Sequence, residues 1–131
     1  MNLILQPDDW QPPKGYSHGM SATGRFVFVS GQVGWSAKGI FESDDLVAQV
    51  RQALENIAAV LAAGGAQPEH VMSLTWYFTD KTEYLARSKD IGEAYRSVMG
   101  KHFPTMTAVQ VSALIEPRAK VEIQAIAVVP G

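Results

Sequence analysis

Cysteine is absent from this 131-residue chain. Its absence excludes disulfide bonds, thiolate nucleophiles and thiolate metal sites. It also agrees with a cytoplasmic location, which we expect for this protein. Long apolar segments are missing too, since no stretch approaches the ~18 apolar residues that a membrane-spanning helix needs. The opening segment, MNLILQPDDWQPP, has no basic region and only a short apolar run, so it does not read as a signal peptide. We expect no membrane partner.

The chain also lacks a large excess of positive or negative charge. The formal net charge is −2 at pH 7, and no block of like charges occurs. The chain therefore lacks the positive surface with which proteins bind nucleic acid. It contains no phosphate-binding or dinucleotide-binding glycine motif. The three histidines, His18, His70 and His102, lie far apart and lack the spacing of metal ligands. We expect no nucleic-acid partner, no cofactor and no metal site.

What the sequence does contain is the pattern of one α+β domain over residues 1–131. Apolar residues recur every three or four positions after a possible acidic cap, which predicts a helix over about Asp45–Ala63. A second helix is predicted roughly over Thr82–Val98, because Asp80 and Glu83 have the spacing of a capping box. The side chains expected to face the core from this second helix are Leu85, Ile91, Tyr95 and Val98.

The remaining elements read as strands. Alternating or β-branched segments predict six of them, of which the first two are weak: Leu3–Leu5, Tyr16–Ala22, Phe26–Ser30, Val71–Phe78, Thr107–Leu114 and Lys120–Val129. We expect a hairpin turn at Thr23-Gly24 and a second one at Glu116-Pro117, which would make the last two strands a pair. This order predicts a sheet of about six strands with both helices on one face.

The other face of that sheet is expected to carry Val71, Thr75 and Tyr77. It is too apolar to remain fully wet, and no third layer is available to cover it. An exposed patch of that kind usually marks association. The sequence therefore predicts a closed homo-oligomer in which sheets pack against one another.

Glu122 is the most suggestive side chain for chemistry. It lies in a strand that is otherwise nearly all apolar, where a carboxylate is costly unless it is paired or hydrogen-bonded. Such a carboxylate suits general acid–base catalysis, although the residues by themselves favour a pair with a Lys or Arg at a subunit interface. Ser30 precedes Gly31 at a strand end and could reach a pocket rim, and Tyr16 could point into a pocket. No nucleophile-elbow pattern surrounds Ser30.

Several segments together resemble one known family. They are Gly15-Tyr16 with Gly19, the segment FVSGQ at 28–32, QVRQALEN at 49–56, Pro104 with Val109 and Val111, and VEIQAIAV at 121–128. In this order and spacing they are similar to the RidA/YjgF family from about Gly15 to the end. The resemblance implies a single domain with a chorismate-mutase-like fold. It also implies a homotrimer built around a central barrel, with small-molecule sites in the clefts between subunits.

Members of the deaminase type hydrolyse reactive enamines and imines of amino acids without a cofactor. The resemblance therefore implies that Glu122 holds the attacking water and that Tyr16 and Ser30 contact the substrate. The substrate would also contact the segment from Met106 to Ala108, that is Met106, Thr107 and Ala108. One position departs from the pattern: deaminase members have P-x-R followed by Ser or Thr, whereas this chain has Met106 in place of the arginine.

An arginine at that position would grip a substrate carboxylate with two hydrogen bonds. Its loss in a dry pocket costs about 1.5–3 kcal/mol or more of binding energy. We therefore expect a hydrolase for a bulkier or uncharged enamine or imine. A non-catalytic ligand-binding or interaction trimer is the alternative. An ordinary deaminase would need another cation, for which Arg25, Lys89, Lys101 and Arg118 are the options considered. Ribonuclease activity has the least support in the composition.

Overall fold

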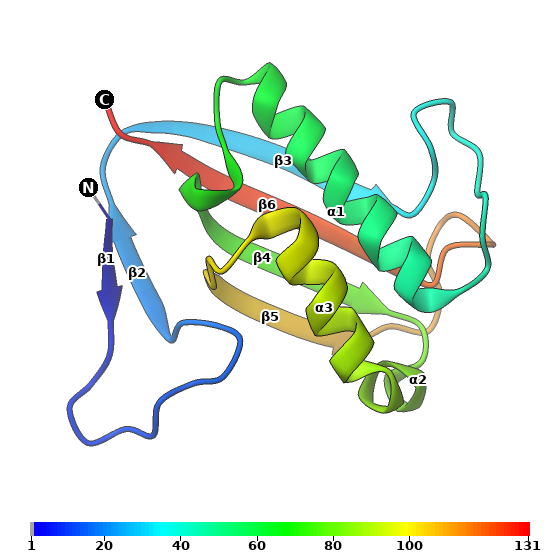
Figure 1. Ribbon diagram of the computed structural model, residues 1–131, viewed down its shortest axis with the longest axis horizontal. Coiled ribbons are helices and arrows are strands. Elements are labelled where there is room, and N and C mark those ends of the chain that lie inside the picture. The colour runs from blue at the N-terminus through cyan, green and yellow to red at the C-terminus, as the bar shows by residue number, and fades with distance from the viewer. Residues whose placement is uncertain (1) are drawn as a thin grey trace.

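The computed structural model describes residues 2–131, and its main body is a four-stranded sheet covered by helices on one face (Figure 1). The strand order is β3–β6–β4–β5. The bounds are Arg25–Val33 for β3, Val71–Phe78 for β4, Thr105–Gln110 for β5 and Val121–Val129 for β6. Strands β3 and β5 therefore form the two edges. The α+β class is confirmed, and so is the placement of the helices on one face.

Helix α1, at Leu46–Ala63, begins and ends where the sequence predicts. Asp45 caps it by accepting a hydrogen bond from the Ala48 N–H at 3.0 Å. The buried side chain of Gln49 then connects the helix to the segment that directly precedes the strand at 121–129. Its amide accepts the N–H of Lys120 at 2.8 Å and donates to the Arg118 carbonyl at 3.0 Å. Gln49, the first residue of the QVRQALEN segment, therefore stabilises the fold through hydrogen bonds to the backbone.

The second predicted helix is interrupted. The structure has α2 at Lys81–Ala86 and α3 at Ser88–Met99, with Arg87 between them outside both helices. The change of direction at Arg87 turns Leu85 outward, where 60% of it is exposed, so its predicted burial is wrong. Ile91 and Tyr95 on α3 are buried as predicted. A short 3₁₀ turn, η1 at Pro68–His70, leads into β4.

The predicted pairing of the last two strands is wrong. Strand β5 pairs in parallel with β4, whereas β6 lies antiparallel between β3 and β4. The segment from β4 through α2 and α3 to β5 is a strand–helix–strand crossover, and such a crossover returns the chain parallel to its first strand. Strand β6 therefore comes from the far end of the chain to occupy the centre of the sheet.

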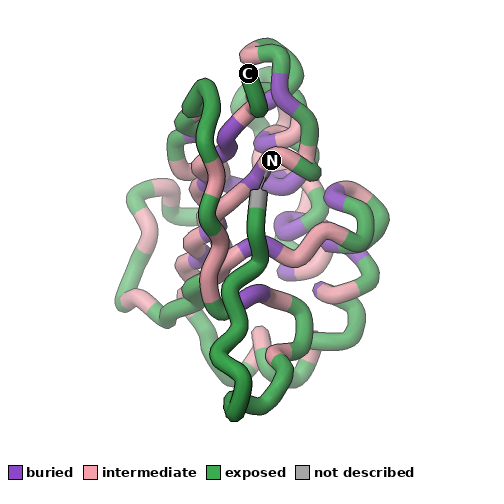
Figure 2. Tube along the Cα trace, turned by 90° about the vertical axis from the view of Figure 1, so that its left-hand side faces the viewer, coloured by how far each residue is buried: buried purple, intermediate pink, exposed green. Residues whose placement is uncertain are grey.

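A second, two-stranded sheet lies apart from the main one (Figure 1), and the segment that follows the N-terminus is exposed (Figure 2). It pairs β1 at Asn2–Leu5 with β2 at Gly19–Ala22 in antiparallel register. The expected hairpin at Thr23-Gly24 is therefore wrong, because β2 pairs with β1 while β3 pairs with β6. The six strands are present, but they are divided between two sheets. Large apolar side chains of β1 are exposed in this single chain, namely Leu3, Ile4 and Leu5.

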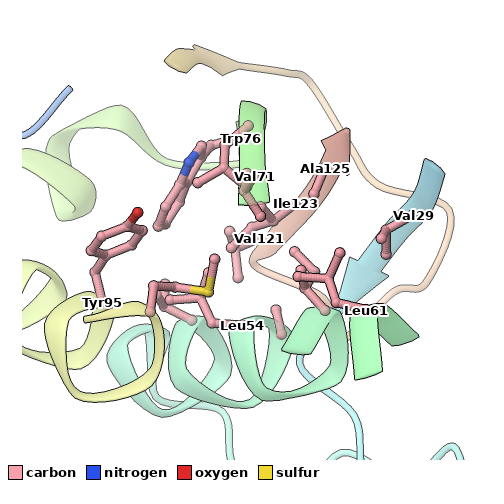
Figure 3. Packing of buried hydrophobic residues seen from close by; sticks show 14 of the residues in the cluster. Val29, Leu54, Leu61, Val71, Trp76, Tyr95, Val121, Ile123 and Ala125 are labelled. Atoms are coloured by element: carbon pink, nitrogen blue, oxygen red, sulfur yellow. The ribbon is translucent and has the colours of Figure 1, made fainter. Parts of the chain in front are cut away.

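The core lies between the main sheet and the helices. It takes alternate residues of β6 and β4 together with the apolar stripe of α1 (Figure 3). Val71 belongs to this core, contrary to prediction, because a bulge between Val71 and Ser73 shifts the alternation of β4. The other face of the sheet is uncovered and carries exposed aromatic rings, with Phe26 at 55% and Phe28 at 69% exposure. In residues 2–131, no helix has both the length and the apolar character to cross a membrane.

Candidate functional site

Glu122 lies on the uncovered face of the sheet. Its neighbours Val121 and Ile123 are fully buried against the helices, and alternation along β6 turns Glu122 to the opposite side. In the register of the sheet its partners are Val33 on β3 and Tyr77 on β4. Glu122 is half-buried in the single chain. A carboxylate is therefore held near the middle of the sheet on the face that the helices do not cover.

Gly31 is what makes room for this carboxylate. A β-carbon built on Gly31 would lie 2.0 Å from Oε2 of Glu122 and 2.8 Å from its Cδ. Any other residue at this position would displace the carboxylate from the surface of β3. The pairing of β3 with β6 is irregular here, between Val29 and Gln32, which brings the backbone of β3 close to Glu122. A glycine at this position thus lets the Glu122 side chain lie against the backbone of β3.

The surroundings of Glu122 are polar but carry no cation bonded to it. The three ion pairs found in residues 2–131 all lie elsewhere, around Arg87 and Arg118. On the same face, the Tyr77 hydroxyl donates to the side-chain carbonyl of Gln124 at 3.3 Å. Ser30 is exposed on the edge strand β3, immediately before Gly31. These residues form the carboxylate side of the candidate site, defined as Glu122, Gly31 and Ser30.

Met106 faces the other way. It pairs with the buried Leu74 on β4 and packs against the core, on the helix side of the sheet. There it lines a pocket of about 210 Å³ between α3 and the β4–β5 edge. We call this the pocket side of the candidate site. Most of its wall is apolar or aromatic: Leu74, Trp76, Tyr84, Ile91, Tyr95, Phe103, Pro104 and Met106.

Two cations and a hydroxyl complete the wall of this pocket. Lys14, Ser88 and Arg96 line it, and Nη1 of Arg96 lies so close to Gly92 that a β-carbon there would be only 3.3 Å away. None of the four cations named as substitutes for the missing arginine lines the pocket. Arg118 instead bonds Asp44 at 2.9 Å. Sequence reasoning missed Lys14 and Arg96 because only the fold brings them to Met106.

The aromatic part of the wall is fixed by hydrogen bonds. The Tyr95 hydroxyl donates to the His102 carbonyl at 2.5 Å, and the ring of Tyr95 stacks on Phe103 with centroids 5.8 Å apart. Burial raises the pKa of the Tyr95 hydroxyl. This group therefore stays a neutral donor committed to His102, and it is not a candidate base. His102 is held in turn by a 2.6 Å contact between its Nε2 and the Val71 carbonyl.

The N-terminal segment closes the pocket at the start of β5. The Ser17 N–H donates to the Pro104 carbonyl at 3.0 Å, and the Ser17 hydroxyl donates to the Phe103 carbonyl at 2.6 Å. Gly15 lines the pocket, whereas Tyr16 is half-buried and its ring meets His18 edge-on at 5.4 Å. Tyr16 is thus near the pocket without being part of its wall in one chain.

The remaining predicted contacts are divided between the two faces. Thr107 pairs with Thr75 and lies on the uncovered face, and it is exposed. Ala108 pairs with Trp76 and lines a smaller pocket of about 160 Å³ beside Phe78 and Tyr84. The predicted site residues are therefore not brought together within one chain. The sheet separates Glu122 from Met106, and β3 and β5 are opposite edges.

No cluster of metal-ligating side chains occurs in the part of the chain that the structure describes. Sequence reasoning also gave Trp76 no role at the site, although Trp76 lines the pocket. Its signal was available, because a tryptophan carries a polar N–H that a core position must satisfy. In the structure this N–H of Trp76 is buried and has no hydrogen-bond partner.

Comparison with known proteins places this arrangement in a family. Residues 8–129 match the family described as Endoribonuclease L-PSP. A RutC family protein of Pyrococcus horikoshii is 35% identical over 129 residues, covering 97% of this chain and 98% of that protein. A 2-iminobutanoate/2-iminopropanoate deaminase of Capra hircus is 34% identical over 106 residues, covering 79% of this chain and 73% of that protein.

The likeness extends to solved structures. The crystal structure of a protein of unknown function from Yersinia pestis, assigned to the conserved Rid family, has a TM-score of 0.87 and 30% identity to this chain. The match covers 98% of both chains, so the two folds agree along nearly their whole length. Together with the sequence matches, this agreement shows that the chain belongs to the RidA/YjgF family.

Proposed function

We propose that the protein is a cofactor-independent hydrolase, a deaminase of an enamine or imine other than the usual small 2-imino acid. The observation that carries the proposal is the carboxylate of Glu122, which lies against Gly31 and has no cation bonded to it in residues 2–131. Such a carboxylate is free to accept a proton from water. The deaminase name of the goat relative supports the reaction class.

The separation of the two sides supports a site shared between copies of the chain. Within one chain the sheet stands between Glu122 and the pocket beside Met106. The uncovered face carries Phe26 and Phe28 with more than half of each exposed, an apolar surface suited to association. We infer a homotrimer in which each cleft takes its carboxylate from one subunit and its pocket from the next. The small-molecule ligand binds there.

The proposed reaction needs only water. Glu122 would take one proton from a water molecule while the water oxygen adds to the carbon of the protonated C=N bond, which gives a carbinolamine. The proton held by Glu122 would then pass to the nitrogen, and the C–N bond would break. Ammonia leaves, and the hydroxyl proton returns to Glu122 and then to solvent as the carbon forms its C=O bond. Positioned proton transfer of this kind contributes about 10²–10⁴-fold in rate.

The choice of substrate follows from Met106. Its thioether side chain gives the pocket an apolar and adaptable wall, where an arginine would have paired with a carboxylate. Eight of the pocket's lining residues are apolar or aromatic, which favours a bulkier or less charged body than that of 2-iminobutanoate. The pocket side thus selects the substrate, and the carboxylate side carries the chemistry.

The test is ammonia release from a panel of imines and enamines that runs from 2-iminobutanoate to larger uncharged compounds. We expect turnover of a bulky or uncharged member, and a loss of about 10²–10⁴-fold in Glu122→Gln. Glu55→Gln, at an exposed position on α1, is the matched control and should keep full activity. Absence of turnover on the entire panel, or an active Glu122→Gln, would reject the proposal.

A second candidate function is a ligand-binding or interaction trimer without catalysis. The replacement of the expected arginine by Met106 is the observation that favours it. In that case a ligand carried through purification would bind equally well to Glu122→Gln. The ribonuclease activity in the family's description has no support in the net charge of −2, and a nuclease assay with Glu122→Gln as its control would test it.

A further inference from the structure

The indole nitrogen of Trp76 is buried without a hydrogen-bond partner. Only 3% of Trp76 is exposed. Its Nε1 is the one buried side-chain polar atom in residues 2–131 that lacks a partner. An indole N–H can only donate, so it needs an acceptor atom. Buried tryptophans usually find one, and an exception calls for an explanation.

The position of Trp76 supplies the explanation. Trp76 lines the same pocket as Met106. The Tyr95 hydroxyl donates to the His102 carbonyl, and its oxygen accepts no hydrogen bond from the Trp76 indole. The two rings lie side by side with centroids 6.3 Å apart, and Figure 3 shows them together at the end of the core away from Leu61. The apolar wall of the pocket therefore contains a residue whose buried donor has no partner.

We propose that Trp76 is a specificity-determining residue that donates its indole N–H to an uncharged acceptor atom on the substrate's tail. The ligand class is a small, mostly flat and apolar molecule with one such oxygen or nitrogen at the end that enters the pocket. The inference rests on the proposed function for the reacting end of the substrate, which would lie at Glu122 of another subunit in the proposed shared cleft. The pocket's volume of about 210 Å³ is below the usual range for ligand sites, so only a small tail fits within one subunit.

The charges at the pocket agree with this orientation. The two positively charged residues of the wall, Lys14 and Arg96, are exposed. The buried donor, the indole N–H of Trp76, is neutral. A ligand with an apolar ring, an uncharged acceptor inside and an anionic group outside satisfies all of these groups. A carboxylate buried against Trp76 would leave its charge unpaired, which the low-dielectric interior opposes.

Two matched probes test the inference: 4-hydroxyphenylacetate, which carries an acceptor oxygen on its ring, and phenylacetate, which lacks it. The chain has three tryptophans, Trp10, Trp35 and Trp76, so its ¹H–¹⁵N spectrum shows three indole signals. We expect 4-hydroxyphenylacetate to shift the Trp76 signal while the exposed Trp10 stays as the internal reference. It should bind about fivefold to tenfold more tightly than phenylacetate, the contribution of one hydrogen bond.

Trp76→Phe should remove that preference and leave phenylacetate binding unchanged, and Trp10→Phe is its matched control. If Trp76→Phe does not fold, the titration of the unmodified protein decides alone, with the Trp76 signal identified by its proximity to Tyr95. A Trp76 signal that ignores both probes, or equal affinities for them, overturns the inference. Glu122→Gln should keep the Trp76 response. If Glu122→Gln does not lower hydrolysis, the proposed catalytic role of Glu122 is rejected, while the role of Trp76 in binding is unaffected.

Discussion

The carboxylate side and the pocket side of the candidate site are built in different ways. On the carboxylate side, Glu122 is placed by backbone fit, because only a glycine at position 31 leaves room for it. On the pocket side, Met106 and Trp76 belong to a wall of side chains between two layers. A wall of that kind can change its selectivity through one substitution without moving the backbone. A substitution in the pocket wall can therefore change the preferred substrate while Glu122 and Gly31 stay in place.

The largest expected effect concerns whether the two sides act across subunits. Glu122→Gln and a pocket-filling Met106→Trp should each be inactive alone. When the two variants are unfolded together and reassembled, a cleft can combine an intact carboxylate with an intact pocket. About a quarter of wild-type activity should return if the subunits mix at random around a ring. A mixed assembly that is confirmed by mass and remains inactive would place both sides in one subunit.

Gly31→Ala should separate catalysis from stability. Its β-carbon would meet Oε2 of Glu122 at 2.0 Å, and this flexible carboxylate end can swing away at little cost in stability. We expect turnover to fall about 100-fold or more, because a displaced base loses its proton-transfer geometry, while the melting temperature changes little. Gly92→Ala, which faces only the mobile end of Arg96 at 3.3 Å, is the control on the pocket side. Full activity in Gly31→Ala would contradict the role of this contact.

Met106→Arg should shift the substrate preference. The arginine restores a bidentate partner for a substrate carboxylate, worth about 1.5–3 kcal/mol. We expect kcat/KM for 2-iminobutanoate to rise roughly tenfold to hundredfold, while turnover of bulkier substrates falls. Met106→Lys adds the charge without the fork geometry and should gain less. Equal kinetics for all three forms would show that this position does not select the substrate.

The smallest effect lies outside both sides, at the start of α1. The Ala48 N–H and the Arg87 guanidinium hold the pKa of Asp45 below its usual value. The stabilisation is therefore present above the pKa of the unfolded chain, near 3.8, and it is lost as pH falls through the lowered folded value. Asp45→Ala should lower the free energy of unfolding by about 1 kcal/mol at pH 7. Denaturant titrations should show this difference shrinking in acid.

Asp45→Asn supplies the matched control, since asparagine caps helices nearly as well without a charge. It should stay closer to the wild type than Asp45→Ala does, and both differences should shrink as pH falls through the lowered folded pKa of Asp45. A difference that persists unchanged in acid would mean that packing, and not the charged cap, stabilises this helix end. Turnover and ligand binding should be unchanged in both Asp45 variants.

Much of the fold could be read from local pattern. The period of apolar residues gave α1 to within one residue, and the alternation in residues 71–78 gave β4 as observed. The same alternation put Glu122 on the face opposite the core of β6. These features are local: hydrogen bonding within a helix and side-chain direction along a strand depend on neighbours only a few residues away.

Two predictions of side-chain burial were wrong because a single residue interrupted the regular period of a strand or a helix. The bulge near Val71 moved that side chain into the core, and the interruption at Arg87 turned Leu85 outward. Neither a bulge nor a helix break changes the composition of its segment, so periodicity could not find them. The parallel pairing of β5 with β4 did have a signal, because a strand–helix–strand order implies it.

The sequence by itself determined most of the elements, the face of β6 that carries Glu122, and the substitution at Met106. Only the tertiary structure decided that these two lie on opposite faces, that Gly31 leaves room for the carboxylate, and that Trp76, in the same pocket wall as Met106, has an unpaired buried N–H. The physical reason is the range of the interactions. Strand order, close backbone approach and the satisfaction of a buried donor all depend on contacts between distant segments, which no local pattern records.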